Sequence, residues 1–398
     1  MDVRPLKIGI DGTCWFNQRG FGRFTRLLLT AMFEQCVEHQ FHVFVDFDPP
    51  PEMLRTNVKV IRVATTASVT EAAVANDSRK IGDILSFRRA VIQENLDVMY
   101  FPAVYSWYPT GGRVPSVITF HDAIAEHFPA LVMPSFRGRL FWRAKTWLAR
   151  RAATKLTTVS FAARQEIAEY FRIDPNKIAV ILEAADPIFR PETDLEKRAE
   201  VRARLGIPAG VALILYVGGM APHKNLIGLL RGYTAAAIAP ALADVDLVFV
   251  GDPDGAGFHS NTQELIDLIA DNPAIAKRVH FTGFVSDSDL VTLYSDAIAV
   301  AMPAFSEGFG LPAAEAIACC TPVIATRGGA VEEIVGPAGL FFDPNSIEEI
   351  AATITLIASD QVIQSRLKGC CLPRAAEMSW KKGAVDMLAV LATSANAR

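Results

Sequence analysis

The sequence contains few cysteines, and none of them is spaced as a metal site or a disulfide framework would require. Of 398 residues only 6 are cysteine: Cys14, Cys36, Cys319, Cys320, Cys370 and Cys371. No C-x-x-C pair occurs, and two adjacent doublets suit neither a zinc cage nor a set of disulfides. We therefore expect a reducing compartment.

Long hydrophobic runs are also missing. No run approaches the ~18 apolar residues that a membrane-crossing helix needs, and the longest, 211–219 and 297–304, have the length of buried strands. The first residues include an acid at Asp2 and do not resemble a signal peptide. These features predict a cytoplasmic protein without a transmembrane helix.

Glycine and proline are not in excess. With 26 glycines, 23 prolines and 51% apolar residues, the composition excludes collagen-like, low-complexity and disordered chains. The length predicts two domains, with three as the alternative. The formal net charge of −4 argues against a dedicated nucleic-acid binder.

Short runs rich in β-branched and aromatic residues alternate with helical patterns such as 22–34 and 348–358. These runs are apolar throughout, which is typical of parallel strands covered on both faces. They lie at 7–11, 42–47, 58–63, 98–101, 117–121, 156–160 and 178–182, and then at 212–218, 247–251, 279–284, 297–302, 323–326 and 340–343. The alternation predicts an α/β fold built of βαβ units.

The series of strands is interrupted at 186–191, where two prolines precede a charged stretch. We therefore expect two doubly wound, Rossmann-like domains, 1–190 and 191–373. Ligands of such sheets bind beyond the carboxyl ends of the strands. Two such edges would face each other across a cleft, which is a preferred place for a small-molecule site.

The segment 303–316 has the features of a phosphate site. A predicted strand ends near Met302, and Pro312 suits the first turn of a following helix. Gly308 and Gly310 let the backbone approach a ligand closely. The N–H groups of Phe309, Gly310 and Leu311, just before the helix, would point at an anion, and the helix dipole would strengthen this attraction.

Two carboxylates, Glu307 and Glu315, bracket this loop. A phosphate would repel a carboxylate, so each is better suited to accept hydrogen bonds from the neutral hydroxyls of a sugar or ribose. The alternative is that both are ordinary glutamates of a loop and a helix.

Glu307 and Glu315, eight positions apart, resemble the E-x7-E signature of glycosyltransferase family 4, the retaining group 1 enzymes with the GT-B fold. The motif style is closest to that of bacterial mannosyltransferases. The resemblance covers nearly the whole chain, through 20–23, 120–122, 158–160, 216–225, 281–285 and 328–333.

The resemblance implies transfer of a hexose from a nucleotide-sugar donor with retention of configuration at the anomeric carbon. It also implies that this reaction needs neither a metal ion nor a cofactor. The donor would lie mainly on the second domain and the acceptor on the first. Glu307 would hydrogen-bond the hexose and Glu315 the ribose, while the Phe309, Gly310 and Leu311 amides and Gly308 would contact the sugar or distal phosphate. In this fold the C-terminal segment 374–398, with an amphipathic helix at 380–391, would pack back on the first domain.

Lys224 follows a predicted strand and is our candidate for stabilising charge on the leaving diphosphate. Asn225 would cap the turn that follows. The family usually has an additional arginine here; in this chain His223 precedes the lysine, and Gly219 with Met220 occupies the earlier place. His223 or another basic residue would then have to supply the missing charge. A solvated lysine in a turn is the alternative reading of Lys224.

In the first half, His121 follows a predicted strand and precedes Asp122. The resemblance implies that His121 contacts the donor sugar and its phosphate; a structural histidine is the alternative. Asp122 would orient His121 or cap a turn. Gly20 and Gly22 would form a loop against donor phosphate and acceptor. A nicotinamide-binding fingerprint would need one more glycine near Thr25, which is absent.

No acidic residue occurs between Glu126 and Glu166. The basic residues in this stretch are Arg137, Arg139, Arg143, Lys145, Arg150, Arg151, Lys155 and Arg164, and the aromatic ones interleaved with them are Phe136, Phe141, Trp142 and Trp147. A helix of this kind over 137–155 can lie on an anionic membrane surface. Alternatively, its aromatic face packs on its own domain. No recognition motif for nucleic acid accompanies it.

The sequence thus predicts a retaining, metal-independent glycosyltransferase of cell-surface polysaccharide synthesis, with a glycan or lipid-linked acceptor and Glu307, Lys224 and His121 as its catalytic residues. GDP-mannose is the first choice of donor, and UDP- and ADP-sugars remain open. A glycoside hydrolase using Glu307 and Glu315 is a weaker alternative, because a hydrolase needs no diphosphate site. A non-catalytic nucleotide-sugar or partner-binding subunit is the other, and the missing arginine is its only support.

Overall fold

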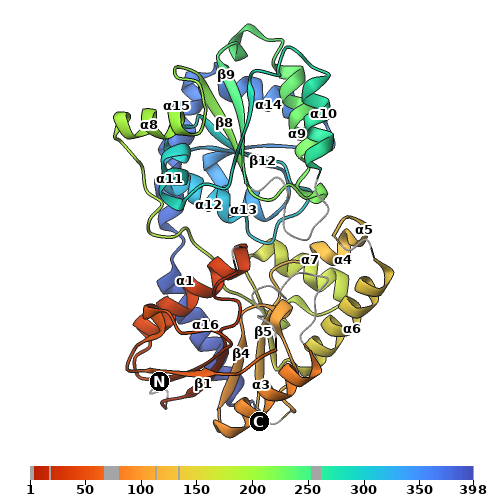
Figure 1. Cartoon of the computed structure of the whole chain (residues 1–398), viewed down its shortest axis with the longest axis vertical. Coiled ribbons are helices and arrows are strands. Elements are labelled where there is room, and N and C mark those ends of the chain that lie inside the picture. The colour runs from red at the N-terminus through yellow and green to blue at the C-terminus, as the bar shows by residue number, and fades with distance from the viewer. Residues whose placement is uncertain are drawn as a thin grey trace. The chain divides into compact units, whose positions relative to one another are not determined.

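The computed structural model describes residues 4–17, 19–66, 80–112, 114–132, 135–251 and 261–397, without the side chains of residues 130 and 131. The chain forms two compact units (Figure 1). The first unit comprises Met1–Glu183 with Ser379–Arg398, and the second comprises Ala184–Met378. The fold is therefore α/β with two parallel-sheet units, as the alternation of strands and helices predicted.

The described strands of the first unit form a seven-stranded parallel sheet in the order β3-β2-β1-β4-β5-β6-β7. The strands are β1 (Lys7–Asp11), β2 (Gln40–Val45), β3 (Val58–Arg62), β4 (Val98–Phe101), β5 (Ser116–Thr119), β6 (Lys155–Thr158) and β7 (Ile178–Val180). The helices are α1 (Gly20–Gln35), η1 (Pro51–Met53), α3 (Ile81–Gln93), η2 (Val104–Ser106), α4 (Ile124–His127), α5 (Pro129–Val132), α6 (Phe136–Ala152), α7 (Phe161–Phe171), η3 (Pro175–Lys177) and α16 (Trp380–Ala395).

The last helix of the chain, α16, belongs to the first unit and lies beside α1 (Figure 1). At Gly383 it also approaches the backbone that follows β7: a Cβ there would lie 3.2 Å from the carbonyl oxygen of Leu182. The rings of Trp380 and Phe24 meet edge to face at 6.0 Å. The C-terminal segment therefore completes the core of the first unit.

The second unit is a six-stranded parallel sheet in the order β10-β9-β8-β11-β12-β13. Its strands are β8 (Ala212–Val217), β9 (Val245–Val250), β10 (Val279–Gly283), β11 (Ala299–Met302), β12 (Val323–Thr326) and β13 (Gly339–Phe342). The helices are α8 (Leu195–Arg204), η4 (Pro222–Lys224), α9 (Leu226–Ala236), η5 (Pro240–Leu242), α10 (Thr262–Ala270), α11 (Asp287–Asp296), α12 (Leu311–Ala318), α13 (Ala330–Val335), η6 (Gly336–Ala338), α14 (Ile347–Ser359) and α15 (Gln361–Ala376).

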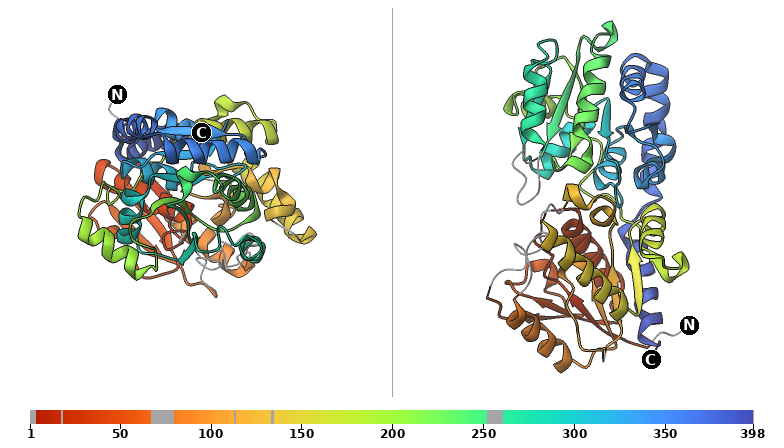
Figure 2. Two further views of the ribbon diagram at one scale, coloured as in Figure 1. Left: turned by 90° about the horizontal axis from the view of Figure 1, so that it is seen from above. Right: turned by 90° about the vertical axis from the view of Figure 1, so that its right-hand side faces the viewer.

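Helices flank the sheet of each unit (Figure 2). The cores are correspondingly apolar: strands β4, β5, β9 and β11 are buried along their whole length. Within the described residues, every helix is too short or too polar to cross a bilayer.

Each sheet has one point at which the strand order reverses direction. In the first unit it lies between β1 and β4, and in the second between β8 and β11. The loops that leave the carboxyl ends of the two strands diverge at such a point and leave room for a ligand. The loops after β8 and β11 hold most of the predicted donor-binding residues.

Candidate functional site

The loops after β8 and β11 are joined by an ion pair between two predicted catalytic residues. The ammonium group of Lys224 donates a hydrogen bond of 2.7 Å to Oε1 of Glu307. Their side chains are only 21% and 14% exposed. A backbone hydrogen bond of 3.0 Å from the Phe305 N–H to the His223 carbonyl holds the two loops together. Lys224 is therefore fixed at the strand-order reversal rather than extended into solvent.

The amide groups predicted to bind an anion are available at the start of α12. In the described part of the chain, the N–H groups of Phe309, Gly310 and Leu311 donate to no other protein group. Gly310, at the N-cap of α12, has φ +90°, and a Cβ there would lie 2.8 Å from Cγ2 of Val331. Only glycine fits this position, which supports the predicted loop.

Gly219 lies in the loop after β8, where its carbonyl accepts a 2.6 Å hydrogen bond from the buried hydroxyl of Tyr216. Tyr216 thus ties the glycine loop to the end of its strand. Asn225 caps the η4 turn as its C-cap residue, and its backbone N–H donates a 3.1 Å hydrogen bond to the carbonyl of Pro222. It has a left-handed conformation with φ 54°, and its side-chain amide donates to the carbonyl of Pro344 at 2.8 Å rather than capping α9.

In the ligand-free protein His223 does not supply the charge of the missing arginine. Burial, and then the neighbouring Lys224 ammonium, lower the pKa of its imidazole to about 3. Because the ring is neutral near pH 7, it adds no charge to neutralise a diphosphate. Its buried Nδ1 atom has no hydrogen-bond partner among the described residues. Lys224 is therefore the cation that the structure places in this loop.

Glu315 lies in α12 and is 3% exposed. The hydroxyl of Tyr294, from α11, donates a 3.0 Å hydrogen bond to Oε2 of Glu315. The alternative of an ordinary exposed helix glutamate is wrong for this residue. Contact of Glu315 with a ribose stays a prediction.

In the first unit, Gly20 and Gly22 lie in the first turn of α1. A Cβ on Gly22 would lie 1.9 Å from the carbonyl oxygen of Asn17, so the preceding loop can pass only over glycine. The guanidinium of Arg26 donates to the carbonyls of Trp15 and Asn17 at 2.7 and 3.2 Å. Packing therefore accounts for Gly22 without a ligand, and contact of either glycine with donor or acceptor stays a prediction.

The ring of His121 is 8% exposed and packs edge to face against Phe24 at 4.8 Å. Its Nε2 lies 2.9 Å from the carbonyl oxygen of Pro102, which can only accept, so Nε2 carries a hydrogen. Its Nδ1 faces Oε1 of the buried Glu183 at 3.6 Å. Burial raises the pKa of Glu183, and His121 opposes this shift. Contact of His121 with a donor stays a prediction.

Asp122 has the role of a turn cap, one of the two that the sequence left open. Its Oδ1 accepts a 3.0 Å hydrogen bond from the Ile124 N–H at the start of α4.

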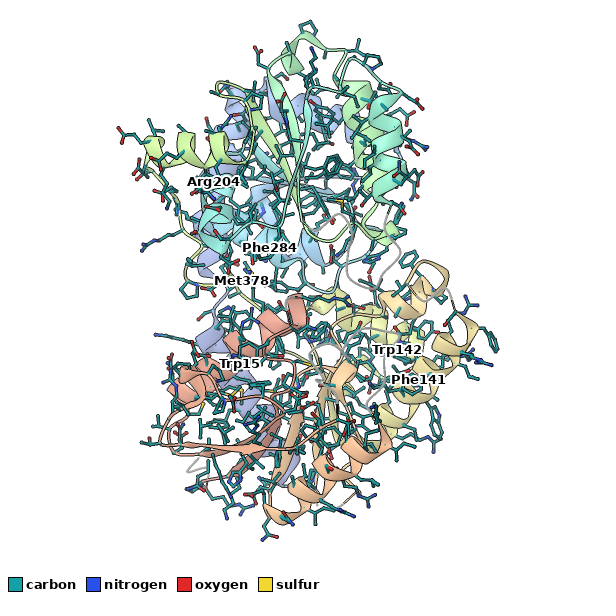
Figure 3. All side chains as sticks on the ribbon, in the orientation of Figure 1. Trp15, Phe141, Trp142, Arg204, Phe284 and Met378 are labelled. Carbon is teal, nitrogen blue, oxygen red and sulfur yellow. The ribbon has the colours of Figure 1, made fainter. Side chains whose placement is uncertain are left out.

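The basic stretch forms α6 and continues into β6. One of its aromatic residues packs inward: Trp142 is 5% exposed and stacks on Tyr105 at 5.0 Å. Its neighbour Phe141 is 46% exposed, and the two consecutive side chains are labelled in Figure 3. Exposed large apolar residues on α6 are Phe136, Leu140, Phe141, Trp147 and Leu148. The outward face of α6 is thus both apolar and basic, with Arg137, Arg143 and Arg151 exposed.

Glu126 anchors the inward face of α6. Its Oε1 accepts a 2.7 Å hydrogen bond from the indole N–H of Trp142. Burial, and then the charge of Asp122, raise the pKa of Glu126 to about 7. The sequence contained no signal for this contact.

Replacing Glu126 by glutamine is expected to stabilise the first unit at pH 8 but not at pH 4.5. The folded state binds this proton more tightly than the unfolded chain, so stability is lost as pH rises through about 7. Glutamine can still accept from Trp142, and we expect a gain of ~1–3 kcal/mol at pH 8. All 5 tryptophans lie in the first unit, so their fluorescence reports its unfolding. The exposed Glu169→Gln is the control, and an equal effect at both pH values would contradict the prediction.

Among the described residues, no group of His, Cys, Asp and Glu side chains is arranged as a metal site.

Two residues of the candidate site, Tyr294 and Glu183, were not predicted from the sequence. Neither lies in a motif that we recognised, and only their contacts to Glu315 and His121 identify them.

Comparisons with known proteins agree with the motifs. Residues 197–369 match the family described as glycosyl transferases group 1, and residues 19–187 match glycosyltransferase family 4. The O-antigen chain mannosyltransferase B of Escherichia coli is 28% identical over 271 residues, 67% of each chain. The D-inositol 3-phosphate glycosyltransferase of Corynebacterium glutamicum is 30% identical over 56% of this chain and 53% of its own. The matches thus span about half to two thirds of these relatives' length.

Solved structures share the fold over nearly the whole chain. A glycosyltransferase from Rickettsia africae superposes with a TM-score of 0.71 at 17% identity, covering 99% of this chain and 100% of that one. HepE of Anabaena, in complex with UDP and glucose, superposes with a TM-score of 0.72 at 20% identity, covering 98% and 100%. WaaG, a glycosyltransferase involved in lipopolysaccharide biosynthesis, gives 0.68 at 16% identity, covering 97% and 99%.

The two family matches together cover both units, and the strand orders agree with the GT-B fold of the structural neighbours. The chain therefore belongs to the group 1 glycosyltransferases of family 4 and has the GT-B fold.

Proposed function

We propose that the protein transfers a hexose from a nucleotide-sugar donor to a glycan or lipid-linked acceptor, with retention and without a metal ion. The observation that carries this proposal is the Lys224–Glu307 pair beside the three amide groups at the start of α12. It combines one cation and several N–H donors for a phosphate with a carboxylate for sugar hydroxyls. This is the set of groups that donor binding and departure require.

In the proposed reaction the bond between the anomeric carbon and the diphosphate oxygen breaks, and the acceptor oxygen bonds to the same face of that carbon. The acceptor proton passes to the leaving phosphate, so no side-chain nucleophile is needed. The Lys224 ammonium and the amides of Phe309, Gly310 and Leu311 stabilise the charge that develops on the leaving group. Glu307 orients the hexose, and Glu315 holds the ribose.

The donor that we propose is GDP-mannose. Its support is the motif style and the likeness to a mannosyltransferase of O-antigen synthesis. The HepE structure contains UDP and glucose, so UDP-sugars are the main competitors. A thermal-shift screen of GDP-, UDP- and ADP-sugars separates them, since a ligand at ~100 times its Kd adds ~2.7 kcal/mol of stability.

The activity is tested with the purified protein, the best donor from that screen and a membrane-extracted acceptor fraction. Release of nucleoside diphosphate that depends on the acceptor, with an α-linked product from an α-linked donor, supports the proposal. Inversion at the anomeric carbon would overturn the retaining mechanism. If the protein binds the donor but releases no nucleoside diphosphate with any acceptor, the result would instead favour the alternative of a non-catalytic nucleotide-sugar-binding subunit.

We further propose that the outward face of α6 attaches the protein to the cytoplasmic face of a membrane, in the service of cell-surface polysaccharide synthesis. Arginines on a surface of exposed aromatic and aliphatic side chains match an anionic lipid surface, where each cation adds about 1 kcal/mol. The attachment would bring the enzyme to a lipid-linked acceptor.

Vesicle flotation is expected to recover the protein with vesicles containing about 30% anionic lipid, and much less with neutral vesicles. The double variant Phe141→Ser/Trp147→Ser should lose most of this binding. As a control, Ile238→Ser/Val362→Ser removes apolar groups that are 88% and 78% exposed in the second unit. Equal recovery with both lipid compositions would contradict attachment by α6.

A further inference from the structure

Tyr294 is a buried tyrosine whose hydroxyl is directed at a residue of the candidate donor site. It lies in α11 and has no exposed surface. Its hydroxyl donates to Oε2 of Glu315 at 3.0 Å, and Glu315 is itself 3% exposed. This contact joins two helices that are neighbours in the second unit.

Two further contacts fix Tyr294, one at its main chain and one at its ring. Its main-chain carbonyl accepts a hydrogen bond from the hydroxyl of Thr321, which follows the α12 helix that carries Glu315. The ring of Phe189 packs against it edge to face at 5.8 Å. A phenol fixed in this way presents its hydroxyl in one direction, so it constrains the carboxylate that accepts from it.

Glu315 needs such a donor if it is to bind neutral hydroxyls. A buried carboxylate is stable as an anion only when hydrogen-bond donors replace water, and bonds to an ionised acceptor are the stronger kind. A carboxylate has about four lone-pair sites, so the anion can accept from a ligand hydroxyl as well as from the tyrosine. The thiol of Cys319 lies in the same environment. Burial raises its pKa to about 12, a hydrogen bond with Ser295 opposes this shift, and the charge of Glu315 adds to it.

We propose that Tyr294 is a positioning residue for the donor nucleotide, acting through Glu315 on the two hydroxyls of the ribose. This rests on the proposed function, in which Glu315 holds the ribose. Loss of the Tyr294 hydroxyl would leave the carboxylate less well oriented and would weaken only those contacts that depend on the ribose hydroxyls.

The test measures binding by isothermal titration calorimetry. GDP, UDP and ADP are titrated into the wild type, and the nucleotide that binds most tightly is carried forward with its 2′,3′-dideoxy counterpart. Tyr294→Phe is expected to weaken binding of the ribonucleotide about tenfold, the effect of one hydrogen bond to a charged group. The dideoxy nucleotide, which lacks the hydroxyls, should bind wild type and variant equally.

Tyr233→Phe is the matched control. Tyr233 is also fully buried in the second unit, and its hydroxyl donates one hydrogen bond of 2.6 Å, to the carbonyl of Val245. The same atom is removed in both variants, so any general loss of stability appears in both. Only Tyr294→Phe should weaken binding of the ribonucleotide while leaving binding of the dideoxy nucleotide unchanged.

The double variant Tyr294→Phe/Glu315→Ala should bind no more weakly than Glu315→Ala, because the tyrosine acts through the carboxylate. Wild-type affinity in Tyr294→Phe, or equal weakening of both nucleotides, would overturn the role of Tyr294 while leaving the proposed function intact. If the wild type binds none of GDP, UDP and ADP, the proposed function fails and this role fails with it.

Discussion

Replacing Lys224 by methionine is expected to lower kcat for sugar transfer about 10²- to 10³-fold, with a smaller effect on donor binding. Methionine keeps the length of the apolar stem but removes the ammonium group. The measurement is steady-state release of nucleoside diphosphate in the presence of acceptor. Circular dichroism of the variant checks that the second unit is still folded.

The size of the effect follows from what else is near the leaving group. In the proposed reaction the neutral imidazole of His223 adds no charge, so Lys224 and the amides at the start of α12 would share the stabilisation of the departing diphosphate. The charge on the leaving oxygen grows toward the transition state, so a cation placed there lowers the barrier more than it strengthens binding. Lys224→Arg should retain part of the activity, because the charge is kept.

Lys197→Met is the matched control for this prediction. Lys197 lies in the same unit and also pairs with a glutamate, Glu192, at 2.6 Å. Its loss removes the same charge but at α8, where no predicted site residue lies. Equal activity of wild type and Lys224→Met would refute the assignment of Lys224. Equal losses in both lysine variants would show that the effect is one of net charge.

The strands could be predicted from the sequence because parallel strands covered on both faces are apolar throughout. The predicted run 98–101 coincides with β4, which is buried along its length. The ends were less certain. Strand β2 begins at Gln40 rather than 42, because the backbone of Gln40 pairs with Lys7 of β1, and backbone pairing is not visible in the sequence.

The site could be predicted in part, to the extent that motifs name single residues. Lys224 and Glu307 were both identified, but not their ion pair, because 83 residues separate them and only the adjacency of β8 and β11 brings them together. The sequence left open whether His223 supplies the charge of the missing arginine, because that charge depends on the burial that lowers the pKa of its imidazole. Burial and long-range contacts are properties of the folded chain.

Replacing Glu307 by glutamine is expected to move binding and catalysis in opposite directions. Glutamine has nearly the same shape but no charge, so the Lys224 ammonium loses its partner at 2.7 Å and turns fully to the diphosphate. We expect the nucleoside diphosphate product to bind about 3- to 10-fold more tightly, since a partly buried ion pair no longer competes. Calorimetric titration measures this affinity.

In the same Glu307→Gln variant, kcat/KM for the donor should fall about 10- to 100-fold. A neutral amide accepts a hydrogen bond from a sugar hydroxyl less strongly than a carboxylate does, and the difference is worth ~1.5–3 kcal/mol. A hexose held less firmly is less well aligned for attack on its anomeric carbon. The opposed shifts distinguish this result from local unfolding, which would weaken both.

Glu192→Gln, in the Lys197–Glu192 pair, makes the same chemical change outside the site and should alter neither quantity. Glu307→Ala offers a second comparison. It frees Lys224 equally, so its affinity for nucleoside diphosphate should match that of the glutamine variant, while transfer falls further because no acceptor remains for the sugar hydroxyl. Weaker binding of nucleoside diphosphate by both variants would contradict this prediction. It would mean that Glu307 contacts the nucleotide, and that the Lys224–Glu307 ion pair of the ligand-free protein does not compete with the diphosphate for Lys224.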